Sequence, residues 1–515
     1  MSQLRDHEPV VLEEFNGLWD RGDEEDVPLD HFRDVENCDT SKFGSGFRSR
    51  DGIGIYQDVV ATLGNILRMH NYVMQTGYSL IVLVRATDDD DDYDVYHVVN
   101  DTTVLGPILS FNDMGSVIPD IKVVSFNGRA YISPFSTYGT GDNAVEKGID
   151  NEFVYVYKGD GTAARKAAGN SPTSGTLTIA NGTGNTDAGF HLFGVAYETD
   201  TGFITAPARF TGFTTVAANG VSFSNIPVSP DSFVVARRLV ATRAITNYNG
   251  DTTGYTYYYI PDGRIPNNSA TTLSDISFFD ADLLEEASPA IDSYAEIPAG
   301  AALGLYHNRL CVGATFDDIS LGLVSLAGEP ESINQISGLI IVPLDGTAIT
   351  NFQELRDILY VFKRAKTVGY SDNGGDPSSW PFTQVDQAIG CPVHGIATVI
   401  DSGGVSMDFI VTSSFAGVMV FNGQYARPEL SWKIQNFWFE QDRNEFKRIQ
   451  MCNDTVSKTL WITLPDYRLL KADYAEGLDP KKIKWWPFRF EMRATTIALT
   501  NIDDLIIGSE TRLES

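Results

Sequence analysis

Many residues of this sequence could do chemistry, but few fall at a spacing that a known chemistry requires. The seven histidines, at positions 7, 31, 70, 97, 191, 307 and 394, show no HxxxH pattern for a metal. Cys38, Cys311, Cys391 and Cys452 form no CxxC pair, so they predict buried free thiols rather than a zinc site or a disulfide framework. Neither a GxSxG elbow nor a GxxxxGK[ST] loop occurs. We therefore expect no catalytic residue, no cofactor and no metal.

Clustered acidic residues are the next candidates for a metal-binding or catalytic site. The run Asp88–Asp92, followed by Asp94, lacks the spaced ligands, the glycine and the final glutamate of an EF-hand loop, so it predicts a solvated hairpin tip. Ser371–Trp380 (SDNGGDPSSW) is interpreted as a turn-rich loop. A glycosidase needs two opposed carboxylates, and 68 acidic residues offer too many pairs for any one to be singled out.

One basic cluster surrounds an aromatic run near the end of the chain. Lys481, Lys482, Lys484 and Arg489 flank or lie within the segment KWWPFRF (484–490), a combination that could grip a nucleic-acid strand. A strand of alternating apolar residues, preceded by a basic turn, explains the same residues, and we favour that interpretation. The net charge of -30, from 38 basic and 68 acidic residues, also argues against a DNA-wrapping role.

The elements that must position these residues are predicted to be β-hairpins. Turn residues separate short apolar runs at Thr76-Gly77, Asn127-Gly128, His307-Asn308, Asn453-Asp454 and Asn501–Asp503. These hairpins recur roughly every 40 to 60 residues, a period typical of propeller blades. Asn351–Lys363 has some helical spacing, but its apolar end with aromatic and β-branched residues favours a strand. The predicted fold is an all-β, multi-bladed propeller.

The sequence divides into four regions by its composition and by its pattern of short apolar runs and turns. Residues 1–35 form an acidic N-terminal arm, 36–168 the first blades, 169–285 an inserted β-sandwich of fibronectin type III kind, and 286–515 the remaining blades. The arm carries an apolar island of Phe15, Leu18 and Trp19. That island belongs either to a solvated tail or to a clasp that docks on a neighbouring subunit.

The N-terminus and the hydropathy pattern indicate where in the cell the protein is made. The first 20 residues have charges at Arg5 and Asp6 and no apolar core, so no secretory signal is expected. No apolar stretch reaches the length of about 18 residues that a spanning helix needs. We expect a soluble protein made in the cytoplasm.

The aromatic residues of the sandwich suggest a second function. Phe190, Phe193, Tyr197, Phe203 and the cluster Tyr255–Tyr259 could recognise surface glycans or a receptor. Their alternation into a core is the default explanation. Exposed tyrosines in a row would favour binding.

Several phrases resemble the β-propeller tail proteins of tailed bacteriophages, with the tail nozzle protein of short-tailed phages nearest. They are EEFNGLWDRGDEEDVPLDHF (13–32), FGSGFRSRDGIGIYQDV (43–59), AYETDTGFITAPARF (196–210), FVVARRLVATR (233–243), IPAGAALGLYHNRLCVG (297–313), GEPESIN (328–334), IIVPLDGTAITNFQELRDILYVFK (340–363) and FAGVMVFNG (415–423).

The resemblance implies a virion protein that forms a ring, usually of six copies, at the distal end of a tail tube. Such a ring continues the DNA channel, retains the genome before infection, and contacts the tail adaptor and the tail fibres. An acidic ring suits this role, because fixed negative charge keeps phosphates from sticking to the wall. The alternatives are a host-surface or glycan-binding tail adhesin and, with less support, a propeller glycosidase.

Overall fold

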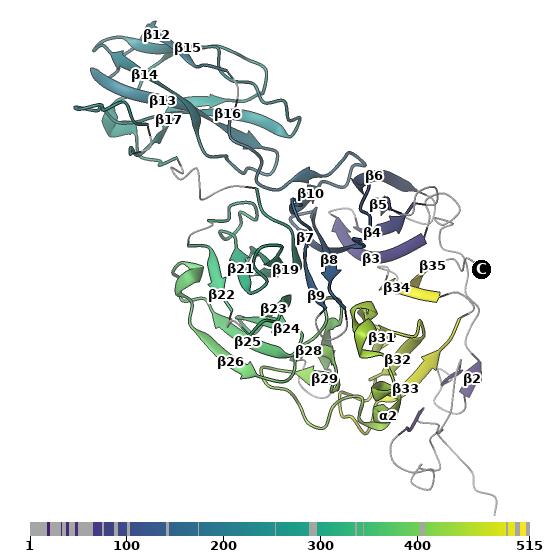
Figure 1. Cartoon of the computed structure of the whole chain (residues 1–515). Coiled ribbons are helices and arrows are strands. Elements are labelled where there is room, and N and C mark those ends of the chain that lie inside the picture. The colour runs from purple at the N-terminus through teal and green to yellow at the C-terminus, as the bar shows by residue number, and fades with distance from the viewer. Residues whose placement is uncertain are drawn as a thin grey trace, which may run out of the picture.

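The protein is nearly all β-strand in a computed structural model (Figure 1). The structure describes the following residues: 18–20, Phe32, 38–40, 47–49, 65–74, 77–86, 91–99, 103–140, 144–173, 175–252, 254–287, 296–334, 337–342, 345–401, 407–490, 493–499 and 505–510. Apart from one short α-helix, α2 (Gln435–Phe439), the helices within these residues are 3-10 turns: η3 (Asp280–Asp282), η4 (Pro377–Ser379), η5 (Trp432–Ile434) and η6 (Arg443–Arg448). None of the helices in these residues is long and apolar enough to cross a membrane.

Seven small antiparallel sheets in the described residues form a propeller. Their strands are β3 (Asn65–Met74), β4 (Gly77–Arg85), β5 (Tyr93–Val98) and β6 (Val104–Phe111); β7 (Pro119–Phe126), β8 (Arg129–Tyr138), β9 (Val145–Gly148), β10 (Tyr155–Tyr157) and β11 (Arg165–Lys166); β19 (Gly300–Tyr306), β20 (Arg309–Thr315), β21 (Leu321–Val324) and β22 (Leu339–Ile341); β23 (Ile349–Leu355), β24 (Ile358–Lys363), β25 (Lys366–Ser371) and β26 (Phe382–Asp386); β27 (Ile396–Asp401), β28 (Met407–Ser414) and β29 (Gly417–Phe421); β30 (Met451–Asp454), β31 (Thr459–Thr463), β32 (Leu469–Asp473) and β33 (Lys484–Phe488); and β34 (Arg493–Leu499) with β35 (Leu505–Glu510).

The sheets close into a ring because the last one packs against the first. Strand β34 contacts both β30 and β3, while β3 contacts β7, and β19 contacts β7 and β23. Two threonines of β34 seal the closure: Thr496 Oγ1 accepts a 2.9 Å hydrogen bond from the Met69 N–H, and Thr495 Oγ1 donates to the Ile66 carbonyl at 2.7 Å. A ring of this kind leaves few free sheet edges.

The hairpin turns follow the sequence closely in most places. Asn127-Gly128, His307-Asn308 and Arg356-Asp357 all have positive φ at both central residues, which is the type I′ geometry that joins twisted strands. Asn351–Lys363 is therefore a strand pair rather than a helix. The predicted turn at Asn453-Asp454 is wrong, since both residues belong to β30 and the chain turns after them. Asn501–Asp503 lies outside the described residues.

The second unit is a β-sandwich inserted between β11 and β19. One sheet contains β12 (Thr178–Gly182), β15 (Gly220–Ser224) and β18 (Leu273–Ile276), and the other contains β14 (Ala208–Thr215), β13 (Gly189–Thr199), β16 (Val234–Ala241) and β17 (Tyr258–Ile265). Alternate residues of both sheets, among them Phe193, Phe223 and Leu239, fill the core between them. The chain is thus an all-β propeller with an inserted sandwich, whose strands lie within the predicted 169–285.

A short hairpin of β1 (Cys38–Thr40) and β2 (Phe47–Ser49) lies outside both units, and β1 contacts β33 of the propeller. The thiols of Cys311 and Cys391 are free and buried, as expected from their isolation in the sequence, and that of Cys452 is free and half-buried.

Candidate functional site

A buried ion-pair network joins the sandwich to the propeller. Arg165, on β11 of the propeller, donates to both carboxylate oxygens of Glu331 at 2.7 and 2.8 Å, and to Asp200 in the sandwich at 3.0 Å. Arg129, on β8, reaches the same Asp200 carboxylate at 3.0 Å. The Glu331 side chain is only 1% exposed, so its charge is paired away from water. This network ties the two units together.

Apolar contacts surround this joint. Phe203 of the sandwich packs into a cluster of propeller residues, and the Arg165 guanidinium lies 4.8 Å from the ring centre of Phe233. The Thr201 hydroxyl also hydrogen-bonds to Glu331. With polar groups satisfied and apolar groups covered, the joint behaves like a small core of its own.

A second polar network fills the centre of the propeller. Arg68 on β3 makes a bidentate pair with Asp120 on β7, at 3.0 and 2.7 Å. His394 Nε2 lies 3.2 Å from the same carboxylate, and the Gln450 side chain donates to the carbonyls of Met69 and Ile497 at 2.9 Å. Residues from five sheets or their connections therefore meet near the centre of the propeller.

The central network sets the protonation states of its members. Burial alone would raise the pKa of Asp120, but Arg68 and His394 hold that pKa well below its usual range. Burial, with help from Lys122 and Arg68, lowers the pKa of His70 to about 3. Burial also lowers the pKa of His394 well below 6.5. Both imidazoles are neutral and the carboxylate is charged at pH 7.

A cavity of about 290 Å³ opens at one end of this network. Arg85, Lys447 and Arg448 line it together with Glu146, whose pKa is raised by burial. Its walls carry both charge signs. Asp120 is committed to Arg68, so the cavity lacks the free pair of carboxylates that a glycosidase needs among its described lining residues.

The outer face of the larger sandwich sheet carries a strip of aromatic rings. Phe210 stacks on Tyr257 with ring centres 4.2 Å apart, and Phe190 stacks on Tyr248 at 4.7 Å. Glycines let these rings lie close to the backbone, because a Cβ on Gly194 would come within 2.7 Å of the Phe210 ring. Tyr259 packs against the same cluster. We call Phe190, Phe210, Tyr248, Tyr255, Tyr257 and Tyr259 the aromatic strip.

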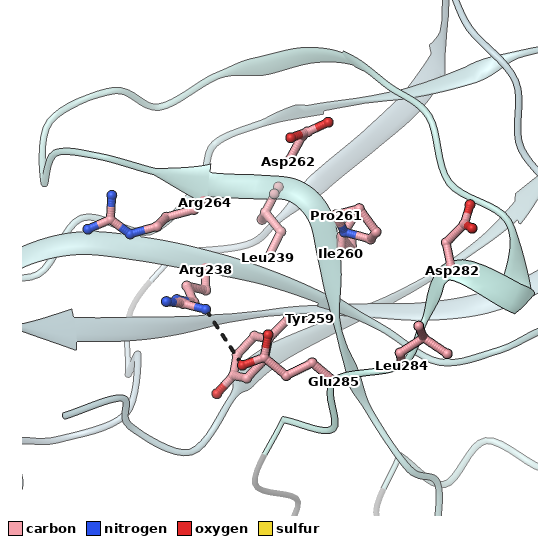
Figure 2. A pocket seen from close by; sticks show the side chains of 11 residues that line it. Arg238, Leu239, Tyr259, Ile260, Pro261, Asp262, Arg264, Asp282, Leu284 and Glu285 are labelled. Atoms are coloured by element: carbon pink, nitrogen blue, oxygen red, sulfur yellow. Dashed lines mark ion pairs between the residues drawn. The ribbon is translucent and has the colours of Figure 1, made fainter. Parts of the chain in front are cut away.

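Next to Tyr259 the strip borders a polar pocket of about 280 Å³, shown in Figure 2. Arg238 and Arg264 both donate to Glu198, at 3.0 and 2.9 Å, which holds the two guanidinium groups side by side. The Arg238 guanidinium lies 5.2 Å from the Tyr259 ring centre and 3.9 Å from Glu285. An aromatic surface beside fixed hydrogen-bond donors and acceptors is a common arrangement for binding a polar ligand.

The sequence identified only part of this strip. Phe193, Tyr197 and Phe203 are 0%, 3% and 5% exposed, so the default explanation, burial, is confirmed for these three and the alternative of ligand contact is contradicted. Phe193 and Tyr197 lie on the same side of β13 because side chains alternate along a strand, whereas Phe203 follows that strand and packs against the propeller. Phe190 and the members of Tyr255–Tyr259 at positions 255 and 259 are half-buried on the outer face, while Tyr257 is buried beneath it. Phe210 and Tyr248 were missed because nothing in their local sequence marks them.

The arm residues lie against their own chain where they are described. Leu18 is 4% exposed within an apolar cluster of the propeller, and its N–H donates to the Trp485 carbonyl at 2.9 Å. Trp19 packs edge-on against Trp432, with ring centres 5.4 Å apart. Phe15 lies outside the described residues. A contact between the arm and a second subunit stays a prediction.

The basic and aromatic segment 484–490 is a propeller strand. Trp485 and Trp486 on β33 are both fully buried, so neither ring can stack on a nucleic-acid base. The favoured interpretation of a strand after a basic turn is confirmed, but the strand is buried on both faces and does not alternate between buried and exposed residues. Within the acidic run, Asp91 and Asp92 precede β5 in a turn, and Asp88–Asp90 lie outside the described residues.

Comparisons with known proteins add little. Neither a family of known proteins nor a curated protein matches the sequence. Among solved structures, AztD from Citrobacter koseri aligns with a TM-score of 0.31 at 9% identity, over 87% of this chain and 90% of that one. Hsv2 from Kluyveromyces lactis aligns with a TM-score of 0.28 at 10% identity, over 82% of this chain and 97% of that one. Values this low carry no argument about function.

Proposed function

We propose that this chain is a structural subunit of a bacteriophage virion, a tail nozzle or tail-tube ring that forms part of the DNA ejection channel and retains the genome before infection. The resemblance of its sequence phrases to tail propeller proteins motivates the proposal. The structural observation that carries it is the buried joint of Arg165, Asp200 and Glu331. Subunits that close a ring must hold one shape, and this joint holds the two units of the chain together.

The polar network near the centre of the propeller bears on where such a channel would lie. Arg68, Asp120 and Gln450 hydrogen-bond across the centre, so one propeller offers DNA no passage. We propose that the channel lies between copies, in a ring that we propose to be a hexamer. The charge of -30 per chain makes its wall repel phosphates, which lets DNA slide without sticking. The tail adaptor and tail fibre proteins are the proposed neighbours.

Electron microscopy of the purified protein tests this proposal. The expected result is a closed ring with a central opening, together with labelling of a phage tail tip by an antibody against the chain. A monomer at high concentration that shows no affinity for tail adaptor proteins would contradict it.

A second candidate function is recognition of glycans on the host surface, which the aromatic strip favours. Rings such as Tyr259 stack on the apolar face of a sugar, and Arg238 and Arg264 supply donors for its hydroxyl or carboxylate groups. The full-length chain on a glycan array tests this function, with Tyr259→Ala as the strip variant. Phe382→Ala is the matched control, since Phe382 is a 54% exposed aromatic residue on the propeller. If Tyr259→Ala and Phe382→Ala bound the same glycans equally well, the aromatic strip would not be the binding site.

A further inference from the structure

A cluster of metal-binding side chains lies where two neighbouring propeller blades turn. His307 occupies the turn between β19 and β20, and Glu354 and Asp357 lie at the turn between β23 and β24. His307 Nε2 is 3.6 Å from Glu354 Oε1 and 3.5 Å from Asp357 Oδ1. One ligand atom from each of the three residues lies within 4.8 Å of the others.

The two separations from His307 Nε2 fit a small divalent cation. Bonds of about 2.0–2.2 Å in tetrahedral geometry place neighbouring ligand atoms about 3.3–3.6 Å apart. One imidazole nitrogen with two carboxylate oxygens is a ligand set that suits Zn²⁺ and leaves a fourth position for water. Asp357, whose side chain is 91% exposed, leaves the site open to solvent.

A carboxylate behind the imidazole is the second observation that points to a metal. Asp372 Oδ2 lies 4.0 Å from Nδ1, the other ring nitrogen of His307. Histidines that bind metals usually donate their free ring N–H to a carboxylate, which fixes the tautomer and orients the ring. At 4.0 Å the Asp372 carboxylate lies beside this nitrogen but beyond hydrogen-bond distance, so it would have to move closer when the metal binds. Three carboxylates therefore surround one imidazole, while Arg309 at 3.8 Å from Asp372 offsets only one of their charges.

The buried residue Tyr306 preorganises the cluster. Its ring stacks on the His307 imidazole, with centres 4.1 Å apart and planes 17° from parallel. Its hydroxyl donates to the Asp357 carbonyl at 3.0 Å and accepts from the Asp372 N–H at 3.2 Å. The backbone N–H of His307 also donates to Glu354 Oε2 at 3.0 Å. One fully buried side chain thus ties together the segments that carry three of the four residues.

We propose that His307, Glu354 and Asp357 bind a divalent transition-metal cation, Zn²⁺ by its ligand set, with Asp372 orienting the histidine. The cation joins two adjacent blades at one end of the propeller and keeps one position open to water. This inference does not depend on the proposed function in a virion. The competing arrangement is a protonated His307 paired with the carboxylates and no metal.

Calorimetric titration of the untagged, chelator-treated full-length chain with Zn²⁺ tests the site. We expect one saturable equivalent, and we expect Co²⁺ in its place to give the visible absorption of a cobalt–imidazole site. Asp357→Asn and His307→Ala should each weaken Zn²⁺ binding at least about tenfold, and Asp372→Asn by about 10- to 100-fold. The matched control is Asp376→Asn, an exposed carboxylate in the same loop as Asp372 but outside the cluster, which should bind as the natural chain does.

Because the Asp357 side chain is exposed, we expect its replacement to leave the protein folded. Unchanged melting curves of the metal-free variants would confirm that the substitutions do not unfold the protein. Absence of one-site binding, or equal affinity in His307→Ala and the natural chain, would overturn the proposal. Equal weakening in Asp376→Asn would overturn it too, since binding would then follow general surface charge.

Discussion

Replacing Glu331 by glutamine should loosen the joint between the sandwich and the propeller. The carboxylate accepts from Arg165 at 2.7 and 2.8 Å and from the Ala168 N–H at 2.8 Å, while 1% of the side chain is exposed. Glutamine keeps the shape but turns one acceptor into a donor that faces the Arg165 guanidinium. Breaking a buried pair costs about 3–5 kcal/mol, and because Asp200 still pairs with Arg165 we expect about 3 kcal/mol.

Scanning calorimetry with limited proteolysis measures this effect. Since each unit has its own core, the loss should appear as earlier, separate melting of the sandwich and as cleavage near residues 167–175. Glu285→Gln is the control, because the Glu285 side chain is 70% exposed and lies 3.9 Å from Arg238. That change should alter stability by at most about 1 kcal/mol. If Glu331→Gln melted and resisted protease like this control, the Arg165–Glu331 pair would not support the joint, and only the pairs with Asp200 would remain to hold it.

Three further predictions concern stability and assembly. Burial lowers the pKa of His70 to about 3 and of His97 to about 4, so the unfolded chain binds protons below pH 6.5 that the folded chain does not. Urea unfolding at pH 7 and pH 5 should therefore show a loss of up to about 2 kcal/mol per histidine, whereas equal midpoints would contradict their neutral burial. Thr496→Val removes the acceptor of the Met69 N–H at the ring closure and should cost about 1–3 kcal/mol in the same assay. Deleting residues 1–30 should weaken ring assembly in analytical ultracentrifugation, and an unchanged oligomer would remove the arm from the interface.

Local sequence signals predicted much of the fold. Asn127-Gly128 and His307-Asn308 lie at type I′ turns, since asparagine, glycine and the turn geometry they favour are local properties of the chain. The turn predicted at Asn453-Asp454 was misplaced because Asp454 does not form the turn itself. It ends β30, and its side chain accepts from the N–H groups of Val456 and Ser457.

The candidate sites could be predicted only in part, because their members meet through tertiary structure. Arg165 and Glu331 are 166 residues apart, and His307 and Glu354 are 47 apart, so no motif spacing links them. Alternation along β13 separates Phe190 on the outside from Phe193 in the core, but which face is outside depends on the register with β14 and β16. That register is a property of the whole sandwich.

The oligomeric state of the purified chain tests the central claim most directly. Sedimentation velocity combined with negative-stain microscopy, at several protein concentrations, distinguishes a closed ring from a monomer. The proposed tail-ring function predicts a ring, with six copies and a central opening wide enough for duplex DNA between the propellers. A chain that sediments as a 56.5 kDa monomer at every concentration, and that also fails to join a ring in the presence of tail adaptor protein, would contradict it.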